Sequence, residues 1–198
     1  MIDQRFVLLG AALTLFGTVR YIWQTVHGRT KPNRVTWTLW ATAPIIGFFA
    51  QLDKGVGLPS ILTLSVGLGP AAILAASFVN PGSYWRIGRF DIACGLVSVA
   101  ALVIWLSLDD PTPAVVFAVF ADLMGGIPTL RKSWIAPETE QASVFALSAL
   151  NGAITVLTID HWNVATWAFP VYIAVLGTVM STVVVTRRRA LAAVPDPA

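Results

Sequence analysis

Residues 114–130 read AVVFAVFADLMGGIPTL, an apolar run interrupted by one carboxylate, two glycines and a proline. This run decides the fold, because it is long enough to cross the hydrocarbon core of a bilayer as a helix. An acidic side chain at the centre of a span costs about 2.5–3.5 kcal/mol on insertion scales, so we expect Asp122 to face a cavity or a polar partner. Pro128 removes a backbone hydrogen bond one turn earlier, and Gly125 and Gly126 weaken the same part of the helix.

The composition is that of a membrane protein. Of the 198 residues, 56% are hydrophobic and 12% are charged, whereas a soluble domain carries about 25% charged residues. The 13 Lys and Arg stand against 10 Asp and Glu and are too scattered for a nucleic-acid surface, so nucleic acid is excluded as a partner. The single cysteine, Cys94, excludes an intramolecular disulfide. No cluster of residues has metal-ligand spacing, so we expect neither a metal nor a cofactor. The apolar composition leads us to expect a lipid bilayer as partner.

Seven segments approach the roughly 20 apolar residues that a transmembrane helix needs. The first is predicted to be a span and not a signal peptide, because Asp3 nearly cancels Arg5 and no small-residue cleavage site follows. The connections are short, so we expect no separate soluble domain. The predicted spans are 5–26, 35–51, 58–79, 90–108, 113–130, 142–159 and 164–186.

Charge alternates between successive connections, which predicts the orientation of the chain. The connections after the first, third and fifth spans and the end of the last span are basic, whereas the others are balanced or acidic. Because basic loops stay in the cytoplasm, we expect a multi-pass protein of the cell membrane with its N-terminus outside and its C-terminus cytoplasmic. The basic residues are Arg29, Lys31, Arg34, Arg86, Arg89, Arg131, Lys132, Arg187, Arg188 and Arg189, and the others are Lys54, Asp53, Asp109, Asp110 and Asp160.

An odd number of spans suits two parallel three-helix repeats joined by a linker helix. Shifting the chain by 108 residues superposes five identical residues in the first and second spans of each half. We therefore predict an all-α integral membrane protein of 3+1+3 design, with repeats at 1–80 and 113–186, a linker at 81–112 and a tail at 187–198. The matched pairs are Leu15 with Leu123, Gly17 with Gly125, Leu39 with Leu147, Ala41 with Ala149 and Ile46 with Ile154.

This arrangement resembles the SWEET and PQ-loop superfamily, which includes cystinosin-like transporters and KDEL-receptor-like proteins. The run 122–126, Asp-Leu-Met-Gly-Gly, is similar to the D-F-x-G-G that opens the second PQ-loop of the cystinosin-like members. The resemblance implies proton coupling through Asp122, a helix-5 proline at Pro128 and a helix-2 proline at Pro44. Thr129 stands where the family has glutamine. Bacterial vitamin-precursor transporters have a related seven-helix arrangement, so that class stays open.

Polar or aromatic residues within the spans are the candidates for solute binding or proton coupling, and each has a structural alternative. Asp122 could instead hold helices together by hydrogen bonds, and Asn151 could bond to another helix. Arg20 could extend to the cytoplasmic interface, the interpretation we favour, or pair with Asp122 or a substrate anion. Trp40 beside Thr42 could stack on a sugar or another ring, or serve in packing.

Helix breakers are the candidates for hinges. Pro44, Pro128 and Pro170 interrupt the second, fifth and seventh spans, and Gly125 with Gly126 lies beside Asp122. A static kink with tight packing is the alternative to a moving hinge.

The predicted function is transport of a small polar solute, such as a sugar, an amino acid or a vitamin precursor, by alternating access. A non-transporting receptor or sorting protein of the KDEL-receptor type is the alternative. An enzyme is not expected, because no catalytic constellation is present. A retinal protein is excluded, because the last span has no lysine for a Schiff base. Association into a homo-oligomer is left open.

Overall fold

The computed structural model describes residues 2–3, 5–53, 59–109 and 111–193, and within them the chain is all-helical. The prediction of an all-α protein is confirmed, with seven α-helices and one short 3-10 turn in the described part and no strand there. The predicted positions of Lys54, Asp110 and the tail residues 194–198 lie outside the described residues. The elements are α1 Phe6–Val26, α2 Arg34–Asp53, α3 Pro59–Ala76, α4 Arg89–Leu106, α5 Pro111–Ile135, the turn Pro137–Thr139, α6 Ala142–Leu157 and α7 Val164–Ala192.

Two helices extend five or more residues past the C-terminal ends of their predicted spans. α5 continues five residues past position 130, and α7 continues six residues past position 186. The extensions contain lysine, arginines and alanines, which favour helix formation in water as well as in lipid. Hydrophobic length therefore predicts the apolar part of a helix and not where the helix ends.

Among the residues that the structure describes, three helices are long and apolar enough to cross a membrane: α1, α4 and the part of α7 from Thr166 to Ala192. Val66–Ala76 within α3 and the whole of α6 are apolar but shorter. These apolar helices are compatible with a membrane protein. That all seven segments cross the membrane stays a prediction.

Several hydroxyl groups within the helices are bonded locally. The hydroxyls of Thr14, Thr18 and Ser148 donate to the carbonyl four residues earlier, at 3.1, 3.0 and 2.9 Å. Such bonds satisfy a hydroxyl without a partner helix, which matters in a medium that offers no water. The Oδ1 of Asn163 caps α7 by accepting the Thr166 N–H at 3.1 Å.

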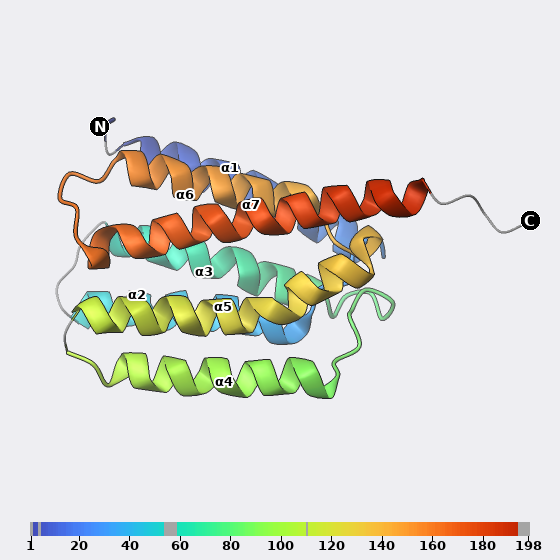
Figure 1. The fold of residues 1–198 in the computed structure, drawn as a ribbon, viewed down its shortest axis with the longest axis horizontal. Coiled ribbons are helices and arrows are strands. Elements are labelled where there is room, and N and C mark those ends of the chain that lie inside the picture. The colour runs from blue at the N-terminus through green and yellow to red at the C-terminus, as the bar shows by residue number, and fades with distance from the viewer. Residues whose placement is uncertain (1, 4, 54–58, 110, 194–198) are drawn as a thin grey trace, which may run out of the picture.

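Each three-helix half has the same order of neighbours. α3 contacts both α1 and α2, and α7 contacts both α5 and α6; in the described part, α1 does not contact α2 and α5 does not contact α6. The two halves meet where α1 packs on α6 and where α2 packs on α5. α4 packs on α5 and α2 at the edge of the bundle, and the start of α1 and the end of α7 lie at opposite ends of the bundle (Figure 1).

Two contacts between the halves are reciprocal. A Cβ added to Gly17 on α1 would lie 3.1 Å from Cδ1 of Leu147 on α6. A Cβ added to Gly125 on α5 would lie 3.0 Å from Cδ1 of Leu39 on α2. The 108-residue shift converts the first pair into the second, so residues matched in sequence also make the matching contact.

Large side chains fill the end of the bundle that carries the basic connections. The core there contains Tyr21 from α1, Ile73 from α3, Phe145 from α6 and Met180 from α7, all buried. Trp37, Val144, Leu176 and Val184 complete this cluster. The bundle is thus closed by packed side chains at its predicted cytoplasmic end.

Candidate functional site

Asp122 lies on α5 and has a hydrogen-bond partner on α7. The hydroxyl of Tyr172 donates to Oδ2 of Asp122 at 2.6 Å. In addition, Nε1 of Trp40 on α2 donates to the main-chain carbonyl of Asp122 at 3.3 Å. Three helices from both halves of the chain therefore converge on this residue.

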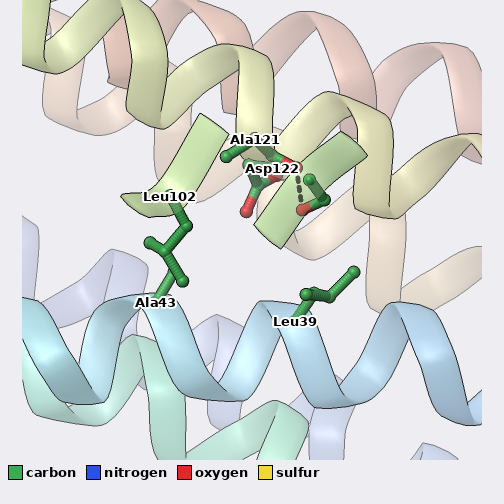
Figure 2. Close-up of a pocket in the computed structure, with 6 residues that line it drawn as sticks. Leu39, Ala43, Leu102, Ala121 and Asp122 are labelled. Carbon is green, nitrogen blue, oxygen red and sulfur yellow. Dashed lines mark hydrogen bonds between the residues drawn. The ribbon is translucent and has the colours of Figure 1, made fainter. Parts of the chain in front are cut away.

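A small cavity lies beside Asp122 on the side away from α7. Its volume is about 10 Å³ and its walls come from α2, α4 and α5 (Figure 2). This is the space of about one water molecule, and it is too small for a sugar or an amino acid. Ser98 closes one side by donating to the Ala121 carbonyl at 2.5 Å, the bond drawn in Figure 2. The lining residues are Leu39, Ala43, Ser98, Leu102, Ala121 and Asp122.

The surroundings of Asp122 suit a carboxyl group that exchanges a proton. Apolar neighbours disfavour the charged form, and the Tyr172 hydroxyl favours it by donating a hydrogen bond. Within the described residues no Lys, Arg or His side chain forms an ion pair with Asp122. The charge on this carboxylate is therefore not fixed by a permanent counter-ion.

Trp40 reaches Asp122 because Gly126 leaves room for its ring. A Cβ at Gly126 would lie 3.0 Å from Cζ2 of Trp40. The Trp40 ring also packs edge-on against Trp37 and Phe145, with centroids 5.3 and 6.5 Å apart. Of the predicted site residues, the structure brings Trp40 and Asp122 together.

The other predicted binding residues lie elsewhere. Thr42 donates to the Thr38 carbonyl in its own helix at 2.7 Å. Asn151 packs against α1, where a Cβ at Gly10 would lie 2.1 Å from its Oδ1. Arg20 is exposed on α1, and no described contact joins it to Asp122. Their roles in binding stay predictions.

The predicted hinge residues lie inside continuous helices. Pro44, Pro128 and Pro170 fall within α2, α5 and α7. The ribbon of α5 changes direction in its C-terminal half (Figure 1), which is the expected effect of Pro128. Gly125 and Gly126 pack directly on α2, so close packing accounts for both glycines. That these prolines act as hinges stays a prediction.

A second polar cluster, not anticipated from the sequence, lies at the end with the basic connections. Nζ of Lys132 lies 2.6 Å from Oε1 of Glu140, and both side chains are 0% exposed. The Tyr21 hydroxyl donates to Oε2 of Glu140 at 2.8 Å. Nζ of Lys132 also donates to the Lys31 carbonyl, and Arg188 donates to the carbonyls of Pro137 and Glu140. We call Tyr21, Lys31, Lys132 and Glu140 the basic-end cluster, because they lie at the end of the bundle with the basic connections.

Lys132 lies beyond the predicted span 113–130, and its pKa is set by opposing effects. Burial lowers the pKa of its ammonium group, and the adjacent Glu140 carboxylate opposes that change. In the sequence, Lys132 and Glu140 are charged residues in or near a connection, and nothing there indicates that they form a buried pair. The signal that could have indicated a partner was Tyr21, because a tyrosine hydroxyl within a helix bundle generally finds one.

Within the described residues, no group of three or more His, Cys, Asp and Glu side chains is placed to hold a metal ion. Comparisons with protein-family models, with curated proteins and with solved structures found no match to this chain. The SWEET and PQ-loop resemblance therefore stays an expectation, and the helix arrangement and the polar groups around Asp122 and Glu140 are the features that bear on function.

Proposed function

We propose that this protein is a seven-span membrane transporter that moves a small polar solute by alternating access. The observation that carries the proposal is the reciprocal pair of contacts, Gly17 with Leu147 and Gly125 with Leu39. Gly17 and Gly125 are separated by 108 positions, as are Leu39 and Leu147, and each glycine contacts the leucine of the other half. Parallel repeats related by an axis along the membrane normal are a transporter design in which the solute site lies near the midplane between the repeats.

The order of neighbouring helices supports the same architecture. In each half the third helix contacts both of the other two, and interchanging the two halves converts the contact α1–α6 into the contact α5–α2, as two repeats related by a two-fold axis would require. α4 packs outside these six helices, as a linker would. We therefore propose 1–80 and 113–186 as the moving units and 81–112 as the linker between them.

The basic-end cluster supplies a closed state on one side. The bond from Tyr21 to Glu140 and the bond from Lys132 to the Lys31 carbonyl both join the first half to the second. The ion pair between Lys132 and Glu140 lies entirely within the second half. Separating the halves therefore breaks hydrogen bonds but leaves the two opposite charges paired. The free-energy cost of opening is thus smaller than it would be if a charge were left unpaired.

Asp122 is the proposed proton-coupling group. Its partner Tyr172 is in the second half and its neighbour Trp40 is in the first, so movement between the halves changes its surroundings. Wetting from one side lowers the cost of the charged carboxylate and permits release of its proton there. Uptake of a proton on the other side completes the cycle.

The first step of the test is to find the solute. Thermal unfolding of the purified protein is measured against sugars, amino acids and vitamin precursors at two pH values, because a ligand that binds the native state raises the melting temperature. Flux of the stabilising solute into proteoliposomes then separates a transporter from a receptor. Binding without flux would favour the receptor of KDEL type.

The second step tests the two-half mechanism. The Lys31 N–H donates to the Thr139 carbonyl at 2.9 Å, so these residues are adjacent across the cytoplasmic end. In a Cys94→Ala background, Lys31→Cys with Thr139→Cys should cross-link under oxidation and stop flux, and reduction should restore it. Each single cysteine variant is the control. Full flux in the cross-linked protein would refute movement of the halves at this end.

A further inference from the structure

A groove lies on the outer surface of the bundle between α5 and α7, separate from both polar clusters. Its volume is about 510 Å³, within the range of about 300–1,000 Å³ that is usual for ligand clefts. Its wall is mostly apolar and includes Leu130, Trp134, Val179 and Val183. Trp134 and Val179 are 56% and 43% exposed, so the groove opens to the surroundings of the protein.

Two arginines stand at this groove. Arg131 is part of its lining, and the guanidinium of Arg131 lies 5.1 Å from the centre of the Phe90 ring on α4. The guanidinium of Arg187 lies 4.5 Å from the centre of the Trp134 ring, and its Nε donates to the Trp134 carbonyl at 3.1 Å. In the described part of the chain neither arginine forms an ion pair with a carboxylate, and the nearby Glu140 is paired with Lys132. The groove therefore combines an apolar wall with the Arg131 side chain in its lining and with Arg187 beside Trp134, and neither arginine has a protein counter-charge among the described residues.

We infer that this groove binds an anionic phospholipid, with an acyl chain along the apolar wall and the phosphate headgroup at Arg131 and Arg187. Both arginines lie at the end of the bundle with the basic connections, which is the predicted cytoplasmic side. The cytoplasmic leaflet is rich in anionic lipids, and basic pockets between helices at this level bind their headgroups. A tryptophan at the headgroup level is typical of the interface. The inference depends on the membrane placement of α5 and α7 and does not require transport.

The test measures lipid binding to the full chain in detergent by native mass spectrometry. The probes are palmitoyl-oleoyl phosphatidylglycerol, which is anionic, and palmitoyl-oleoyl phosphatidylcholine, which has the same chains and no net charge. Wild type should prefer the anionic lipid. Arg131→Gln with Arg187→Gln should reduce that preference about 30-fold, because each interfacial cation contributes roughly 1 kcal/mol.

Two further variants test the contributions of net charge and of the apolar wall. Arg29→Gln with Arg86→Gln removes the same charge from exposed connections at the same end and should leave the preference unchanged. Val179→Trp fills the apolar wall without changing charge and should weaken binding of both lipids. Melting temperatures near that of wild type establish that each variant is folded.

Equal affinity of wild type for the two lipids would overturn the inference. An equal loss in the Arg29 and Arg86 control would also overturn it, because the preference would then reflect net charge and not the groove. A protein that prefers the anionic lipid but moves no solute would leave the inference standing while the proposed function fails. Solute flux without a lipid preference would overturn the inference and leave the proposed function standing.

Discussion

The hydrogen bond between Asp122 and Tyr172 allows the proposed proton coupling to be separated from a structural role. Asp122→Asn keeps the size of the side chain and an acceptor for the Tyr172 hydroxyl at 2.6 Å, but it cannot exchange a proton. Tyr172→Phe removes the donor and keeps the carboxyl group. If Asp122 carries the proton, uptake in the Asn variant should lose its pH dependence, and uptake in the Phe variant should retain it.

The expected cost in stability follows from the same contact. Hydrogen bonds between helices in a membrane contribute on average about 0.6 kcal/mol and at most about 1.7 kcal/mol. Tyr172→Phe should therefore lower the free energy of unfolding by roughly 0.6–1.7 kcal/mol, and Asp122→Asn by less, because an acceptor remains. Asp122→Leu leaves the partly buried Tyr172 hydroxyl without its acceptor, which costs up to about 1–3 kcal/mol. This order of stabilities checks the geometry independently of transport.

The assay is solute uptake into proteoliposomes with and without a pH gradient, combined with thermal unfolding of each variant. A wild-type flux that ignores the gradient would refute proton coupling. An Asp122→Asn variant that keeps full proton-driven accumulation would show that the carboxyl group has only a structural role. Loss of folding in Asp122→Asn would contradict the expected stability order.

Three further outcomes are expected. Gly177→Ala should destabilise the protein by about 1–3 kcal/mol in thermal unfolding, because its Cβ would lie 2.5 Å from a main-chain oxygen of α6, whereas Gly82→Ala, which meets only the Asn80 side chain at 3.4 Å, should have little effect. Glu140→Gln should cost about 3–5 kcal/mol in the same assay, because it leaves the buried lysine without its counter-charge, and a change below 1 kcal/mol would mean that this charge is not buried. Cysteines at positions 3 and 190 should be labelled from opposite sides of intact cells, and labelling of both from one side would refute the orientation.

The sequence identified some features because they are local. Runs of apolar residues between polar connections give the number and approximate position of the helices, since backbone groups in a span are satisfied within the helix itself. Asp122 was identifiable for a similar reason, because a carboxylate within an apolar run is costly whatever its partner is. The helix ends of α5 and α7 were less predictable, since polar residues continue a helix beyond the apolar run.

The partners of these residues were decided only by the tertiary structure. Tyr172 is 50 positions from Asp122, and their contact depends on the packing of α5 against α7. Lys132 and Glu140 have the composition of a solvated connection, yet the fold buries both and adds a tyrosine from α1. By itself the sequence determined which segments are helices and where a charge is out of place, because those properties belong to single segments. Which side chains meet was determined by how seven helices pack, because each helix presents several faces and only the assembled bundle selects among them.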